Sequence, residues 1–187
     1  MSLDMFLQHC FNALTLGSLY ALIAIGYTMV YGILRLINFA HGEVTMIGAM
    51  VTISVLGVFS SMGLALPGPV LVLMALMVAV PTCMLVGFLI ERVAYRPLRN
   101  APRLAPLITD IGLSIVLQNV AILIWGRNYI PFPSLLPHNP IDVFGASITD
   151  LQVVIIVLAI AIMAGLLLMT EKTKLGRAMR ATSQNPA

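Results

Sequence analysis

Five long apolar runs constrain the fold of this chain more than any other feature of its sequence. They extend over Cys10–Tyr31, Val44–Met62, Val70–Ile90, Leu104–Gly126 and Leu151–Met169. Each run approaches or exceeds the about 20 residues that a helix needs to cross roughly 30 Å of hydrocarbon. Four of the runs contain no charged residue, whereas Leu104–Gly126 contains Asp110 and departs most from the pattern of a membrane span.

The composition assigns these runs to a lipid environment. Hydrophobic residues make up 60% of the 187 residues and charged residues 9%, with a mean hydropathy of +1.02. A soluble domain carries about 25% charged residues. Backbone polar groups in lipid must be satisfied within the protein, so only helices or closed barrels cross a membrane, and unbroken apolar runs exclude barrel strands. We therefore predict an all-α, multi-pass integral membrane protein with about five transmembrane helices.

The sequence shows no signature of catalysis, of a cofactor or of a removable leader. Residues 1–9 contain no Lys or Arg and no small-residue cleavage site follows, which predicts a retained first helix. Cys10 and Cys83 lie inside apolar runs, where a thiol acts as a small hydrophobic group, so we expect neither a disulfide nor a metal site. No nucleophile–base pair or glycine-rich phosphate loop is present, so we do not expect an enzyme.

The distribution of basic residues predicts the orientation in the membrane, because short cytoplasmic loops retain Lys and Arg. Nine of the ten basic residues fall on one side of an alternating topology: Arg35, Arg92, Arg96, Arg99, Arg103, Lys172, Lys174, Arg177 and Arg180. The other side contains only Arg127. We expect the N-terminus outside and the C-terminus in the cytoplasm. The net charge of +3 then reflects an inner collar of basic residues and not a nucleic-acid surface.

The outer segment Arg127–Asp150 contains four prolines, at positions 131, 133, 137 and 140. Proline removes a backbone donor and breaks helices, so we expect an ordered cap or loop and not a continuous helix. The segment could dock an extracytoplasmic partner or simply connect two spans, and composition does not separate these alternatives.

A polar break separates the first two runs, with Asn38, His41 and Glu43 within six residues. Asn38 is a residue type that often caps a helix N-terminus, and Glu43 would then lie near the positive end of the next helix dipole. That arrangement would be structural. Polar and charged groups beside membrane helices also mark transport paths, so a role in gating or translocation is the alternative.

A polar stripe runs along the fourth span. Asp110, Ser114 and Gln118 are spaced four residues apart, and therefore share one face of a helix. Their face could form hydrogen bonds to other helices or line a translocation path.

The C-terminal segment has the pattern of a short basic amphipathic helix. Leu175, Ala178, Met179 and Thr182 follow helical spacing, while Lys174, Arg177 and Arg180 recur every three residues beside them. Such a helix could lie on anionic lipid or insert into a groove of a cytoplasmic partner.

Four separated motifs resemble the branched-chain amino acid permease family of ABC importers, specifically its LivH-type subunits. They occur in order along the chain at Gly17–Leu22, Ile37–Glu43, Glu91–Arg99 and Thr173–Ala181. The resemblance implies that residues 1–187 are the N-terminal part of a single transmembrane permease domain in the bacterial inner membrane. It further implies import of leucine, isoleucine or valine driven by ATP hydrolysis in separate subunits.

The partners implied by the resemblance are a second, LivM-type permease, two cytoplasmic ATPase subunits, a periplasmic amino-acid-binding protein and membrane lipid. Residues 171–187 resemble the start of the coupling loop that rests against an ATPase. This similarity makes five residues candidates for ATPase coupling: Leu175, Gly176, Arg177, Met179 and Arg180. Family members continue beyond this loop, so we expect a truncated chain that does not transport alone.

Three other functions stay open at this stage. A secondary transporter or channel would need an ion-coupling site within the bilayer, for which the sequence offers only Asp110. An ABC permease for urea or amides would share similar helices. A structural membrane subunit without a translocation role is the third.

Overall fold

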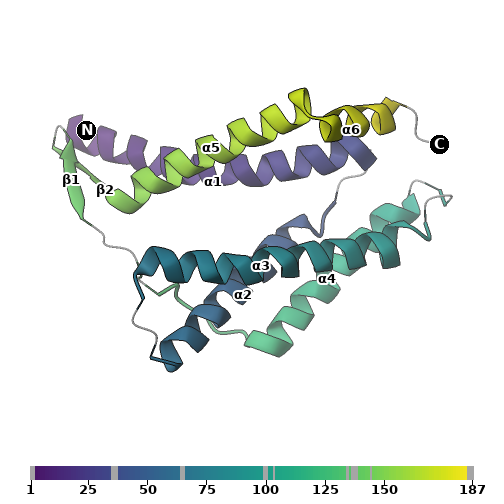
Figure 1. Ribbon diagram of the computed structural model, residues 1–187, viewed down its shortest axis with the longest axis horizontal. Helices are drawn as coiled ribbons and strands as arrows, with labels where there is room; N and C mark the ends of the chain where they lie inside the picture. Colours follow the sequence, from purple (N-terminus) through teal and green to yellow (C-terminus); the bar gives the residue numbers. More distant parts are fainter. Residues whose placement is uncertain are drawn as a thin grey trace. The chain divides into compact units, whose positions relative to one another are not determined.

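The structure is a computed structural model of the chain, and it describes residues 3–34, 38–63, 66–98, 101–102, 104–133, 135, 139–143 and 145–184. Its elements, in order, are α1 (Leu3–Leu34), α2 (His41–Ser61), α3 (Gly68–Ile90), the π-helical turn η1 (Glu91–Tyr95), α4 (Leu104–Trp125), β1 (Pro140–Val143), β2 (Ala146–Thr149), α5 (Asp150–Lys172) and α6 (Lys174–Gln184). Figure 1 shows this arrangement of helices with one small hairpin.

Each apolar run forms a helix long and apolar enough to cross a membrane, which confirms the all-α membrane class and the five predicted spans. The largest difference is at the N-terminus, where α1 begins at Leu3 and not near Cys10. Residues 3–9 contain neither Pro nor Gly, and Asp4 lies in the first helical turn, where a negative charge is favourable. Nothing in this stretch therefore prevents the helix from beginning at Leu3.

The described chain divides into two compact units. The first comprises residues 1–35 and 136–187, and the second comprises residues 36–135.

In the first unit, α1 and α5 lie side by side and run in the same direction (Figure 1). Near their N-terminal ends Gln152 Nε2 donates to Asn12 Oδ1 at 3.2 Å, and near their C-terminal ends Met29 and Thr170 line one cavity. Two spans that run in parallel need an odd number of crossings between them. The three helices α2, α3 and α4 supply that number, which supports α4 as a full span despite Asp110.

A β-hairpin occupies part of the proline-rich segment before α5. Strands β1 and β2 pair antiparallel, with Pro140 opposite Thr149 and Val143 opposite Ala146, and Gly145 adopts the positive φ of 84° that the turn requires. The described residues between Trp125 and Asp150 form no helix, as predicted, but the two strands were not predicted.

The hairpin is fastened to α1 through one side chain. Gln8 Nε2 donates to the Ser147 carbonyl at 2.9 Å, and the Ser147 N–H donates to Gln8 Oε1 at 2.9 Å. The amide of Gln8 thereby takes the place of a third strand at this position. Helix α5 then begins with a capping box, since the Gln152 N–H donates to Thr149 Oγ1 at 3.3 Å and the Thr149 N–H to Gln152 Oε1 at 2.9 Å.

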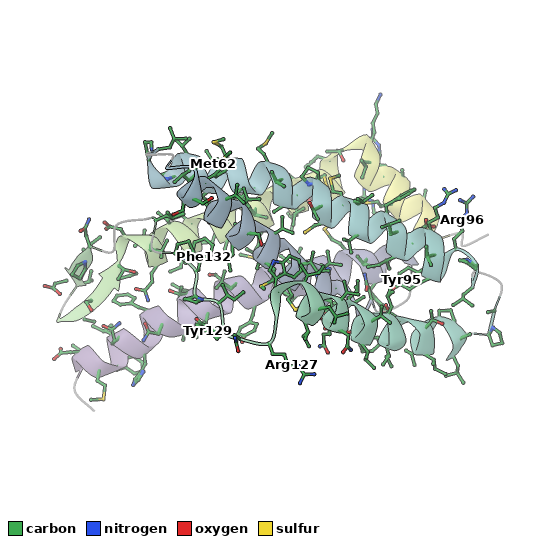
Figure 2. The ribbon with its side chains drawn as sticks, turned by 90° about the horizontal axis from the view of Figure 1, so that it is seen from below. Met62, Tyr95, Arg96, Arg127, Tyr129 and Phe132 are labelled. Carbon is green, nitrogen blue, oxygen red and sulfur yellow. The ribbon has the colours of Figure 1, made fainter. Side chains whose placement is uncertain are left out.

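In the second unit, α2 and α3 form an antiparallel pair joined at a turn in which Gly63 has a φ of 67°. Figure 2 shows Tyr95 and Arg96 at the end of the α3–η1 rod that is opposite to Met62, at the end of α2. Leu56, Leu71 and Ala75 form the buried core of this pair. The helices approach closely near Gly48, where an added Cβ would lie 2.8 Å from Cys83 Sγ.

Candidate functional site

The most buried polar side chain of the described residues belongs to Asp110 on α4, which is 1% exposed. Tyr95, in η1, donates its hydroxyl to Asp110 Oδ1 at 2.7 Å, and the backbone N–H of Phe39, which precedes α2, donates to Oδ2. A carboxylate in an apolar region is costly unless it is hydrogen-bonded. Asp110 therefore joins the entry of α2, the end of the α3–η1 rod and the first half of α4.

One turn farther along α4, the polar stripe bonds to Glu43. Ser114 Oγ donates to Glu43 Oε1 at 3.1 Å, and Gln118 Nε2 donates to the same oxygen at 2.9 Å. Glu43 lies in the first turn of α2, where the helix dipole favours a negative charge. The predicted shared face of Asp110, Ser114 and Gln118 is thus present, and it is turned toward α2 and the residues that precede it.

A third contact between the same two helices lies near their far ends, where Trp125 Nε1 donates to Ser54 Oγ at 2.7 Å. The pairs Phe39 with Asp110, Glu43 with Ser114, and Ser54 with Trp125 are each separated by 71 residues. A constant separation means that α2 and α4 run in parallel and in register. We call this set of hydrogen bonds the α2–α4 polar seam.

The start of α2 differs from the expectation for Asn38. The N-cap residue is Ala40, without a side-chain cap hydrogen bond, and α2 begins at His41. The Asn38 carbonyl accepts from the His41 N–H at 3.3 Å, whereas Asn38 Oδ1 is buried and has no hydrogen-bond partner among the described residues. The prediction of an Asn38 cap is therefore wrong, because a backbone turn over residues 38–41 starts the helix instead. His41 is half-buried and its carbonyl accepts from Thr45 Oγ1 at 3.1 Å.

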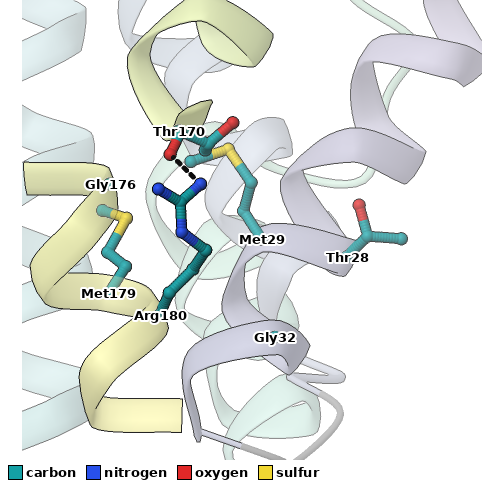
Figure 3. A pocket seen from close by; sticks show the side chains of 7 residues that line it. All are labelled: Thr28, Met29, Gly32, Thr170, Gly176, Met179 and Arg180. Atoms are coloured by element: carbon teal, nitrogen blue, oxygen red, sulfur yellow. Dashed lines mark hydrogen bonds between the residues drawn. The ribbon is translucent and has the colours of Figure 1, made fainter. Parts of the chain in front are cut away.

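The predicted C-terminal helix is present as α6, and it lies against α1 and the end of α5. A cavity of about 320 Å³ between them is lined by Thr28, Met29, Gly32, Thr170, Gly176, Met179 and Arg180 (Figure 3). The five coupling candidates divide into two groups. Gly176 is buried and Met179 is half-buried, and the exposed Arg180 side chain reaches the end of α5. Leu175 and Arg177 are exposed and lie outside this contact.

Three participants in these contacts were not anticipated from the sequence: Tyr95, Ser54 and Trp125. Tyr95 belongs to a motif that carried the family resemblance, but no local spacing connects it to Asp110, which lies 15 residues later. Ser54 and Trp125 are single polar groups within apolar spans, and only the register of α2 against α4 brings them together.

Comparison with known proteins identifies one family along nearly the entire chain. The family described as the permease component of branched-chain amino acid transport systems matches residues 9–187. The chain is 46% identical to the high-affinity branched-chain amino acid transport system permease protein BraD of Pseudomonas aeruginosa, covering 96% of this chain and 60% of BraD. It is 45% identical to LivH of Escherichia coli K12, covering 96% of this chain and 59% of LivH.

A LivH of Salmonella typhimurium gives the same identity and coverage as that of E. coli. The chain thus spans less than two thirds of the length of these relatives. No solved structure matches the chain.

Proposed function

This chain belongs to the permease component family of branched-chain amino acid transport systems, and from that premise we propose that it forms part of the translocation unit of an ATP-driven importer. It is a multi-pass protein of the inner membrane. The observation that carries the proposal is the family match over residues 9–187, which includes every helix of the fold apart from the first six residues of α1.

The proposed substrates are leucine, isoleucine and valine, because relatives 45–46% identical to this chain are named for branched-chain amino acid transport. The proposed partners are a second, LivM-type permease, two cytoplasmic ATPase subunits and a periplasmic amino-acid-binding protein. In this arrangement residues 1–187 belong to a single transmembrane domain, and residues 171–187 begin its cytoplasmic coupling segment. The N-terminus lies outside and the basic collar lies in the cytoplasm, as the distribution of Lys and Arg favours.

The α2–α4 polar seam is the proposed border of the translocation path. Glu43 uses one carboxylate oxygen to accept from both Ser114 and Gln118, and it is only half-buried. A carboxylate at the end of an apolar helix pair can contact the ammonium group of an amino acid. Asn38, with a buried oxygen that lacks a partner among the described residues, and half-buried His41 lie at the same entry to α2. Asp110, which belongs to the seam, binds this entry through the Phe39 N–H.

The test is uptake by proteoliposomes that contain the full-length permease and its partner subunits. We expect accumulation of radiolabelled leucine that requires both ATP inside, at the ATPase subunits, and the amino-acid-binding protein outside. Accumulation without ATP or without the binding protein would favour a secondary transporter or channel. Accumulation of urea or an amide in place of leucine would assign the permease to a different substrate class.

A further inference from the structure

The junction between α5 and α6 is a sharp change of direction with an unusual set of hydrogen bonds. Thr173 is extended, with φ −89° and ψ 163°, and ends α5. Its N–H donates to the Met169 carbonyl at 3.3 Å, and its hydroxyl accepts from the Gly176 N–H at 3.1 Å. The last carbonyls of a helix have no partner within the helix and must find one elsewhere. At this end of α5, the Thr170 and Glu171 carbonyls are two of the groups that need a donor from outside the helix.

Arg180 supplies donors to both of these carbonyls from within α6. One terminal nitrogen of its guanidinium group donates to the Thr170 carbonyl at 2.8 Å, and the other donates to the Glu171 carbonyl at 3.3 Å. Figure 3 shows the Arg180 side chain extending from α6 to Thr170. A positive charge at a helix C-terminus is favourable because the dipole is negative there. The planar fork of arginine presents donors on two terminal nitrogens in a fixed geometry that suits two neighbouring acceptors, whereas a lysine donates from a single nitrogen on a flexible chain.

Gly176 allows the backbone of α6 to lie close to the last carbonyls of α5. It is buried, and a Cβ built on it would overlap the Thr170 carbonyl and approach the Met169 carbonyl oxygen within 2.6 Å. The obstacles are backbone atoms, so they cannot move aside as a flexible side chain would. Any other residue at position 176 would therefore push α6 away from the end of α5.

We propose that Arg180 and Gly176 are positioning residues that hold α6 rigidly on the end of α5, so that a displacement of α6 moves α5 with it. The part of this inference that concerns an ATPase rests on the proposed function. Because Gly176 and Arg180 contact the end of α5, the residues that α6 offers to the ATPase are exposed residues outside this contact, among them Leu175 and Arg177. Without the Arg180 contacts, the extended residue Thr173 would act as a hinge and absorb the displacement.

The first test measures the docking of α6 directly, in the full-length permease assembled with its partner subunits. Met29 on α1 and Met179 on α6 line the same cavity, so a pair of cysteines at these positions, in a background lacking the native cysteines, reports docking by disulfide or short bismaleimide cross-linking. R180Q should lower the cross-linking rate on the order of tenfold, the scale of a lost charge-assisted hydrogen bond. R180K should recover part of the loss, and G176A should also reduce cross-linking.

Lys172 provides the matched control, since it is a nearby exposed cation at the end of α5. K172Q removes one positive charge from the same region and should leave the cross-linking rate at the parent value. An R180Q variant that cross-links as fast as K172Q would overturn the proposal, because α6 would then stay docked without the Arg180 contacts.

The second test separates the positioning role from ATPase binding. R180Q should retain the ATPase subunits through exposed residues such as Leu175 but transport less amino acid per ATP hydrolysed. L175D should release the ATPase subunits and keep the Met29–Met179 cross-link. If L175D retains the ATPase subunits, the coupling role proposed for α6 fails while the docking result stands. If R180Q abolishes the cross-link but leaves uptake per ATP unchanged, the rigid transmission through α5 is refuted.

Discussion

Asp110 should be coupled energetically to Tyr95, although the two residues belong to different helices. The Asp110 carboxylate is 1% exposed and accepts from the Tyr95 hydroxyl at 2.7 Å and from the Phe39 N–H. In D110N, one carboxylate oxygen becomes an NH₂ group, which faces one of these two donors. A buried donor then lacks an acceptor, and the expected cost in the free energy of unfolding is about 1–3 kcal/mol.

Removal of the other partner gives a similar loss by a different route. Y95F deletes this donor and leaves the buried carboxylate, among the described residues, with the Phe39 N–H alone. The loss should cost about 1.5–3 kcal/mol because the hydrogen bond involves a charged group. The double variant D110N/Y95F should lose less than the sum of the single losses, by about 1 kcal/mol or more, since the bond can be broken only once.

The assay is denaturant or thermal unfolding of the full-length permease in detergent or nanodiscs, with a double-mutant cycle built from the four proteins. Tyr129 provides the control, because it is 90% exposed. Removal of its hydroxyl group in Y129F should leave the free energy of unfolding within about 0.5 kcal/mol of the parent value. Strict additivity of D110N and Y95F would refute the reasoning, since it would show that the two side chains do not share an interaction in the folded protein.

Three further predictions concern other parts of the chain. E43Q should reduce uptake of radiolabelled leucine by more than it reduces the amount of permease in the membrane; normal uptake at normal abundance would return Glu43 to a purely structural role. Q8A should remove the hydrogen bonds between Gln8 and Ser147 and speed amide exchange in the hairpin by about tenfold, corresponding to about 1.4 kcal/mol, as measured by hydrogen–deuterium exchange; unchanged exchange would show that Gln8 does not hold the hairpin. In intact spheroplasts, an impermeant thiol reagent should label Y129C and not R96C, and labelling of R96C before lysis would reverse the proposed orientation.

The membrane spans were predictable from sequence because lipid imposes a simple requirement of length and apolarity on each one. The shared face of Asp110, Ser114 and Gln118 followed from the helical period alone. The α6 helix was predictable for the same reason, since its polar and apolar residues alternate with that period.

The partners of these residues could not be predicted in this way. The contact of Tyr95 with Asp110 depends on how the α3–η1 rod returns to α4, which no local spacing encodes. The β-hairpin was not predicted because its strands are only four residues each. One of them is also held by Gln8, which lies 139 residues away in the sequence. The Asn38 cap was wrong because a favourable residue type does not fix the position at which a helix begins.

The sequence also could not predict which α6 side chains face the neighbouring helices. The pattern placed Leu175 and Met179 on one apolar face, but the change of direction at Thr173 turns Met179 toward α1 and leaves Leu175 exposed. The orientation of a short helix depends on the backbone at the junction that precedes it, and this is set by contacts such as those of Arg180.

The in-register pairing of α2 with α4 has a consequence for how the sequences of this family can diverge. Because contacting residues lie 71 positions apart at successive levels, an inserted or deleted residue within either helix would shift every later pair out of alignment. Length changes between these helices should therefore be confined to the connections that precede α4. Exchanges along the seam should occur in matched pairs, with loss of the Ser54 hydroxyl accompanying replacement of Trp125 by a side chain that does not donate.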